Sequence, residues 1–133
     1  MDIEKLDIIQ VRELYGFNDR RKELIKELEQ ELAYIRQQVD ELVVLIFGSF
    51  ITDEPFPHDV DLFISFKPSK DCVADILRYG LDRLHPDVID IQYRKLEYDL
   101  FSAEELVEYF NNNPLNFKQG ISLDRVIELV DVY

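Results

Sequence analysis

Hydrophobic and polar positions follow two different periods along the chain, and these periods predict most of its elements. Between residues 19 and 39, apolar side chains recur at steps of three and four, at Leu24, Ile25, Leu28, Leu32, Ile35 and Val39. Charged and amide side chains fill the opposite positions, so the pattern predicts a long amphipathic helix over 19–39. We expect Asn18 or Asp19 to cap this helix, because a side-chain oxygen there accepts from the free N–H groups of the first turn.

Three short apolar stretches predict β-strands. Residues 42–47 are wholly apolar and end at Gly48, which favours a strand that is covered on both faces. Residues 60–66 and 88–93 are short and mainly apolar, and Pro68 and Pro86 mark their boundaries. Brief runs of this kind are typical of strands rather than of helices.

Helical spacing returns in the second half of the chain. Residues 71–84 repeat apolar positions with a helical period, and Ser102 is expected to cap a further helix that runs to about Phe110. Residues 121–132 are apolar enough for a helix or a strand, and we favour a helix that begins at Ser122.

The order of these elements predicts one α/β or α+β domain over residues 1–133, with a small mixed β-sheet flanked by helices. The core is expected over about 19–110. We expect 1–17 and 114–133 to be peripheral extensions, and the first 16 residues fit either a short helix or a short strand.

Charge and composition restrict the classes of function. The chain has 28 acidic and 15 basic residues, a formal net charge of −13, which argues against a protein that coats DNA or RNA. No apolar run approaches the roughly 20 residues of a membrane span, and the acidic N-terminus is unlike a signal peptide. A single cysteine, Cys72, excludes an internal disulfide framework. We therefore expect a cytoplasmic protein with no membrane partner.

Two acidic residues interrupt the second predicted strand. Asp59 and Asp61 are two residues apart, so their side chains are expected on one face, while Val60, Leu62 and Ile64 pack on the other. Two adjacent carboxylates repel each other unless a cation lies between them. Oxygen ligands at this spacing suit Mg²⁺ or Mn²⁺ better than zinc.

A third acid and a Gly-Ser pair extend this candidate metal site. Asp90 lies in the centre of the third predicted strand, and it completes a three-acid cluster if that strand neighbours the second. Such clusters hold two metals for in-line phosphoryl displacement. Gly48 and Ser49 directly follow the first strand, where a glycine lets a phosphate approach the backbone and a hydroxyl can hold it.

These motifs in this order resemble those of the DNA polymerase β-like nucleotidyltransferase superfamily, particularly its minimal single-domain members. The shared signature is an apolar strand, a Gly-Ser pair, a spacer of about ten residues and an Asp-apolar-Asp-apolar strand start. Here it is formed by Gly48-Ser49, the nine-residue spacer 50–58 and Asp59-Val60-Asp61-Leu62, with Asp90 as the later acid. The resemblance spans roughly residues 19–110.

The resemblance implies transfer of a nucleoside monophosphate from an NTP, with ATP expected, to the hydroxyl of a protein or small-molecule acceptor. Asp59 and Asp61 would then hold two Mg²⁺ or Mn²⁺ ions, and Asp90 would hold the catalytic ion and help to deprotonate the acceptor. Gly48 and Ser49 would bind the terminal phosphates. Minimal members often act with a helical partner protein, including as antitoxins that modify a toxin. The net negative charge makes a nucleic acid a less expected acceptor than a protein or a small molecule.

One departure from the family pattern keeps an alternative open. Many active minimal members carry an arginine or lysine shortly after Gly-Ser, whereas the spacer 50–58 contains only the acids Asp53 and Glu54 among its charged residues. Lys67, Arg94 and Lys95 are candidates to supply the charge from strand ends. The alternative is a catalytically inactive nucleotidyltransferase-like protein that serves as a binding or regulatory module. A third hypothesis is a small structural subunit with an acidic surface.

Overall fold

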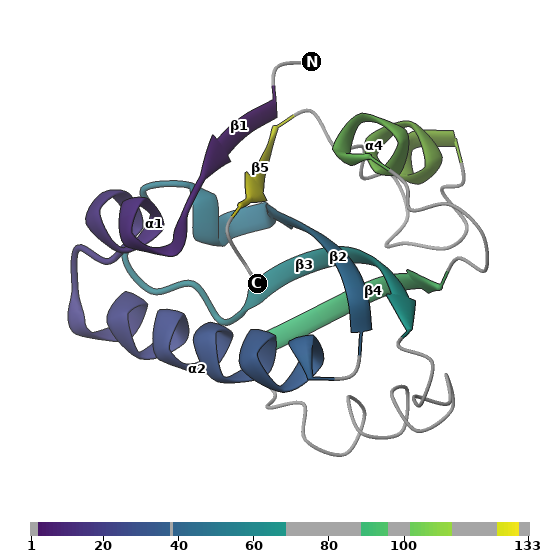
Figure 1. Ribbon diagram of the computed structural model, residues 1–133. Coiled ribbons are helices and arrows are strands. Elements are labelled where there is room, and N and C mark those ends of the chain that lie inside the picture. Colours follow the sequence, from purple (N-terminus) through teal and green to yellow (C-terminus); the bar gives the residue numbers. More distant parts are fainter. Residues whose placement is uncertain (1–2, 38, 69–88, 96–101, 113–124, 131–133) are drawn as a thin grey trace.

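The computed structural model describes residues 3–37, 39–68, 89–95, 102–112 and 125–130 (Figure 1). Its helices and strands are β1 (Ile3–Leu6), α1 (Ile8–Tyr15), α2 (Asp19–Arg36), β2 (Val39–Phe47), the short 3₁₀ turn η1 (Gly48–Ile51), β3 (Val60–Pro68), β4 (Ile89–Lys95), α4 (Ala103–Asn112) and β5 (Val126–Leu129). The predicted helix over 71–84 and Cys72 lie outside the described residues.

The five strands form one mixed sheet in the order β1-β5-β2-β3-β4. β1 runs parallel to β5, and β3 runs parallel to β4. The central strand β2 is antiparallel to both of its neighbours, β3 and β5. The small mixed sheet flanked by helices that the sequence predicts is therefore confirmed.

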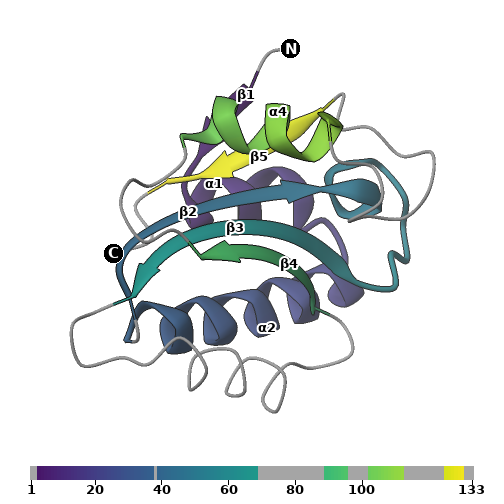
Figure 2. The same ribbon diagram turned by 90° about the vertical axis from the view of Figure 1, so that its right-hand side faces the viewer.

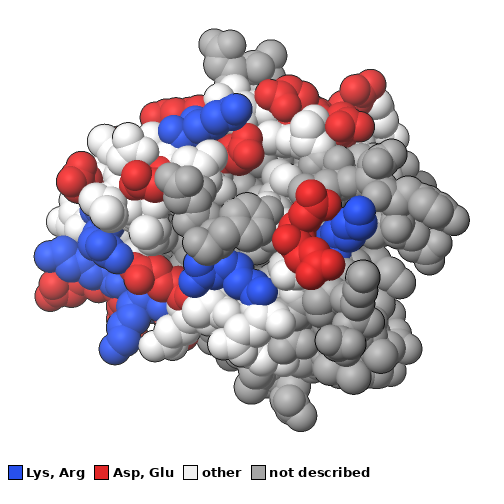
Figure 3. Space-filling view, viewed as in Figure 1, with Lys and Arg blue, Asp and Glu red and all other residues white. Residues whose placement is uncertain are grey.

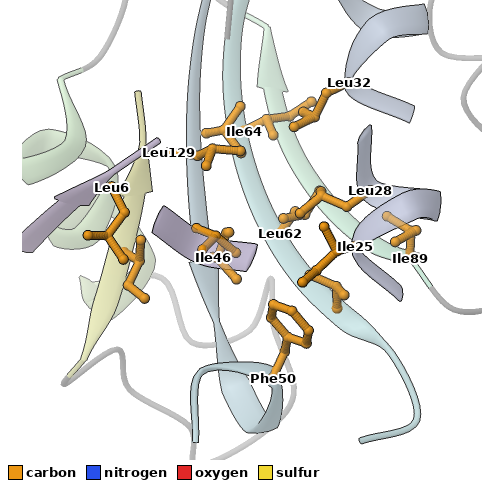
Figure 4. Close-up of a cluster of buried hydrophobic side chains, with 14 of the residues drawn as sticks. Leu6, Ile25, Leu28, Leu32, Ile46, Phe50, Leu62, Ile64, Ile89 and Leu129 are labelled. Carbon is orange, nitrogen blue, oxygen red and sulfur yellow. The ribbon is translucent and has the colours of Figure 1, made fainter. Parts of the chain in front are cut away.

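Helices cover both faces of the sheet, α1 and α2 on one side and α4 on the other (Figure 2). On the α2 side, Ile25, Leu28 and Leu32 point toward the sheet, where they pack with Leu62 and Ile64 of β3 (Figure 4). A smaller cluster on the α4 side joins Leu106 and Val107 to Leu45, Phe63 and Val126. Alternate residues of β3 thus enter different clusters, as the period of a strand requires.

The long amphipathic helix is confirmed, but its end was predicted three residues too late. α2 ends at Arg36, and Val39 is already the first residue of β2. Val39 is buried and fits the helical period, so the apolar pattern continues across a change of element. Asn18 is the cap: its Oδ1 accepts from Arg21 N at 2.9 Å.

The other capping prediction also holds. Ser102 Oγ accepts from Glu105 N at 3.2 Å, and Glu105 Oε1 accepts from Ser102 N at 3.1 Å, which is a capping box at the start of α4. The third predicted strand is present as β4, described over Ile89–Lys95, and it extends two residues beyond its predicted end.

Both ends of the chain contribute strands to the sheet. The first 16 residues contain a strand and a helix, β1 and α1, rather than one of the two. The helix favoured from Ser122 is wrong for residues 126–129, which form β5 between β1 and β2. Val126, Ile127 and Leu129 are buried in clusters on both faces of the sheet. A strand buried on both faces lacks the alternation that distinguishes it from a helix.

Within the described residues, no helix combines the length and the apolar character that crossing a bilayer requires.

Candidate functional site

The β2–β3 pair brings the Gly-Ser motif and the two acids to the same end of the sheet. Phe47, the last residue of β2, is the register partner of Asp61. The chain then leaves the sheet at Gly48, forms η1, and returns through residues 52–59 to the start of β3. Gly48 and Ser49 therefore lie beside the strand start that carries Asp59 and Asp61, as the motif spacing predicts.

The Asp61 carboxylate packs directly against the backbone of Gly48. Gly48 has φ +80°, a conformation that residues with a side chain rarely adopt. A Cβ built on Gly48 would lie 3.2 Å from Asp61 Cγ, and closer still to Oδ2. The space that a side chain would fill at residue 48 is thus the space that the carboxylate uses. This contact gives a physical reason for glycine at the first position of the motif.

The turn after Gly48 is anchored in the core. Phe50 and Ile51 are buried, and the Phe50 ring lies 6.1 Å from the Tyr15 ring, centroid to centroid. Ser49 is half-buried, and its carbonyl accepts from Thr52 N at 3.1 Å and from Thr52 Oγ1 at 2.6 Å. Gly48 and Ser49 therefore stay near the surface while the residues after them fix the turn.

The predicted alternation of β3 is confirmed. Val60, Leu62 and Ile64 are buried on the α2 side of the sheet. Phe63 is buried on the α4 side, where its ring lies 6.4 Å from that of Tyr109. Asp61 shares the Phe63 face by the period of the strand, and both Asp59 and Asp61 are half-buried.

Asp90 occupies the register position beside Asp61. β3 and β4 are parallel neighbours, and Asp61 and Asp90 are paired Cα positions, so their backbones are about 5 Å apart. The Asp90 side chain lies outside the described residues. In the described part of the chain, no three His, Cys, Asp or Glu side chains gather as metal ligands do. The three-acid metal cluster therefore remains a prediction.

The donor chemistry of Asp59 and Asp61 fits a hard divalent cation. Asp59 directly precedes β3 and Asp61 is its second residue, and hard cations such as Mg²⁺ bind carboxylate oxygens. The Asp61 carboxylate approaches the backbone of Gly48, which is exposed.

The candidate cation Lys67 does not lie near these acids. Lys67 is six residues beyond Asp61 along β3, about 20 Å away at the rise of a strand, and its Nζ lies 3.9 Å from Glu41 Oε2. The backbones of Arg94 and Lys95 pair with Ser65 and Phe66, in that same half of β3, and their side chains lie outside the described residues. Lys67 was therefore a wrong candidate for the missing cation.

The residues next to the motif that sequence reasoning missed are at the N-terminus of α2. Arg21 is fully buried and donates to backbone carbonyls of the spacer, and Arg20 donates to the carbonyls of Pro57 and His58, just before Asp59. A signal was present in the sequence. Arg21 falls three residues before Leu24 on the apolar face of the helix, where a charged side chain is out of place.

The spacer contains no basic residue, but the positive charge of Arg21 lies behind the turn that follows Gly48, where Nη1 donates to Phe50 O. Burial lowers the pKa of the Arg21 guanidinium, while the charge of Glu54 opposes that shift, and an arginine remains protonated near neutral pH. On the face formed by α1 and α2, basic side chains lie among acidic ones instead of leaving one continuous acidic surface (Figure 3).

Comparison with known proteins gives a family but no activity. No curated protein and no solved structure matches the chain significantly. The model of a family of unknown function, DUF6932, matches residues 2–124, which is most of the chain. The chain belongs to this family of unknown function, DUF6932.

Proposed function

We propose that the protein is a metal-dependent nucleotidyltransferase of the DNA polymerase β-like type. It would transfer a nucleoside monophosphate from an NTP, ATP first, to a hydroxyl of a protein or small-molecule acceptor. The observation that carries the proposal is the packing of the Asp61 carboxylate on Gly48 at φ +80°, with Asp90 as the register neighbour of Asp61. This juxtaposition joins the three parts of the motif at one end of the sheet.

Each motif residue has a role that its position supports. Asp59 and Asp61 would bind the divalent cations, and Asp90 would bind one of them and accept the proton of the acceptor hydroxyl. Gly48 and Ser49 would hold the terminal phosphates, because both residues lie at the surface and a glycine lets a phosphate approach the backbone closely. Bound Mg²⁺ or Mn²⁺ would neutralise charge on the triphosphate.

In the proposed reaction, the acceptor oxygen attacks the α-phosphorus, the bond to the bridging oxygen breaks, and pyrophosphate leaves. The protein contributes chiefly by positioning the two reactants and stabilising charge. A helical partner protein, as in a toxin–antitoxin pair, is one proposed source of the acceptor. The net charge of −13 makes a protein or small molecule a better candidate acceptor than a nucleic acid.

The test is transfer of label from NTPs labelled at the α-phosphate, with Mg²⁺ or Mn²⁺ and a cell extract as the source of acceptor. We expect labelled acceptor with the unmodified protein and at least a 100-fold loss in Asp59→Asn and Asp61→Asn, because each substitution removes a charged metal ligand. Asp40→Asn is the matched control, since Asp40 is an exposed acid at the far end of β2.

The alternative is an inactive nucleotidyltransferase-like module. It is favoured by one observation: the spacer 50–58 has no basic residue, and both of its acids are exposed. Binding of Mg²⁺·NTP without transfer, lost in the same two variants, would support this module. If the unmodified protein binds neither metal nor nucleotide, both proposals are overturned. The hypothesis of a structural subunit would then be favoured.

A further inference from the structure

Every N–H group of the Arg21 guanidinium donates to a backbone carbonyl. Nε and Nη2 donate to Glu54 O at 3.0 and 2.7 Å, and Nη2 also donates to Thr52 O at 2.7 Å. Nη1 donates to Phe50 O at 2.7 Å and to Tyr15 O at 3.1 Å. Three of the four acceptor residues belong to the spacer between Ser49 and Asp59. A guanidinium has five N–H groups in a fixed plane, so its orientation fixes the carbonyls that it binds.

Aromatic rings enclose the same guanidinium. Its central carbon lies 4.3 Å from the centroid of the Phe17 ring and 5.2 Å from that of Phe50. The side chain has no exposed surface. Burying a cation is costly unless dipoles or charges replace the lost water. Here carbonyl dipoles and ring faces replace it, so the cation depends on the folded spacer and the spacer depends on the cation.

Two neighbours of Arg21 extend the contact along the rest of the spacer. Asn18, the cap of α2, also donates from Nδ2 to Pro55 O at 2.6 Å. Arg20 donates to Pro57 O at 3.3 Å and to His58 O at 2.9 Å. The first turn of α2 therefore binds carbonyls from residue 50 to residue 58, the whole connection between Gly48-Ser49 and Asp59.

We propose that Arg21 is a positioning residue for the candidate site: it fixes the turn at Gly48-Ser49 relative to Asp59 and provides the positive charge that the spacer lacks. The charge lies behind η1, bonded to the carbonyl of Phe50, two residues after Gly48. A fixed cation near a phosphate site favours anion binding most where water is excluded. The identity of the anion, a metal-bound nucleoside triphosphate, rests on the proposed function, whereas the positioning of the spacer does not.

The test uses Arg21→Lys, which keeps the charge but loses the planar fork, and Arg21→Gln, which loses both. The matched control is Arg12→Lys, because Arg12 is an exposed arginine that pairs with Glu29. Amide hydrogen exchange measured by NMR reports the spacer directly, since the Thr52 amide is bonded to Ser49 O and the Glu54 amide to Thr52 Oγ1. Binding of Mg²⁺·ATP, measured by calorimetry, reports the site.

We expect exchange at Thr52 and Glu54 to accelerate about tenfold or more in both Arg21 variants, with β2 and β3 little changed. Affinity for Mg²⁺·ATP should fall in both, and further in Arg21→Gln than in Arg21→Lys because only lysine retains the charge. A merely structural role would give equal losses in the two variants. Arg12→Lys should match the unmodified protein in both measurements.

The outcomes separate this proposal from the proposed function. Faster exchange in the spacer of a protein that never binds Mg²⁺·ATP would support positioning by Arg21 and overturn the nucleotidyltransferase proposal. Unchanged exchange, equal acceleration throughout the sheet, or unchanged affinity in a protein that does bind would overturn the role of Arg21. If neither Arg21 variant folds, Arg20→Lys tests the contact at the Asp59 end of the spacer: weaker binding of Mg²⁺·ATP than in Arg12→Lys is expected, and equal binding would overturn positioning by the first turn of α2.

Discussion

Gly48 is the position at which one added methyl group tests the geometry of the candidate site. We expect Gly48→Ala to lower the free energy of unfolding by about 1–3 kcal/mol, because alanine is strained at φ +80° and its Cβ would collide with the Asp61 carboxylate. Chemical denaturation measures the loss. Binding of Mg²⁺·ATP should weaken in parallel, since the carboxylate must move away.

A double-mutant cycle separates the backbone strain at residue 48 from the collision with the Asp61 carboxylate. With Asp61→Ala in place, the cost of Gly48→Ala should fall to about 1 kcal/mol, the part due to backbone strain. An equal cost in both backgrounds would contradict the contact between Gly48 and the Asp61 carboxylate.

Glu31 is a buried acid on α2 that the candidate site does not use. Burial raises its pKa to about 7, with the charge of Glu27 as a second cause. Among the described residues, its Oε2 meets no hydrogen-bond donor. Between its ordinary pKa of 4.5 and about 7, the unfolded chain releases this proton while the folded chain keeps it. Stability is therefore expected to fall as the pH rises through this window.

The substitution Glu31→Gln removes this titration. The free energy of unfolding of the variant, relative to the unmodified protein, should rise by about 2–3 kcal/mol between pH 4.5 and pH 8. Urea denaturation at several pH values measures the change. A pH-independent effect of the introduced amide on stability cancels when the values at the two pH values are subtracted. Glu13→Gln, a change at an exposed acid of α1, is the control variant. A flat difference for Glu31→Gln would refute the shifted pKa.

At the scale of elements, sequence periodicity predicted those parts of the structure whose two faces differ. The alternation of residues 59–64 separated the acids from the side chains that pack under α2, and the structure confirms that separation. The cap at Asn18 was predictable because the need for an acceptor at a helix start is local.

Elements set by distant partners were less predictable. β5 is a strand because β1 and β2 pair with it on its two sides, and its own sequence does not record those partners. The bonds from the first turn of α2 to the spacer join residues about 30 to 40 positions apart in the chain. Only the misplaced charge of Arg21 on an apolar face indicated them.

The net charge of the whole molecule affects its stability as well as its choice of ligand. A charge of −13 on 133 residues makes the folded state repel itself, so added salt should raise the melting temperature by screening. General screening acts on every acid alike. Binding of a divalent cation with nucleotide would instead depend on the acids beside Gly48. Stability measured at constant ionic strength therefore distinguishes a built site from a merely acidic surface.

We expect Mg²⁺·ATP at about 100 times its dissociation constant to stabilise the protein by about 2.7 kcal/mol, close to 10 °C in melting temperature for a chain of this size. NaCl at equal ionic strength should give a smaller rise. The rise specific to Mg²⁺·ATP should vanish in Asp59→Asn/Asp61→Asn and persist in Asp40→Asn/Glu13→Gln. Both double variants remove two negative charges, but the second removes them from exposed positions elsewhere. Equal responses in the two would show that the stabilisation is screening and that the two aspartates form no specific site.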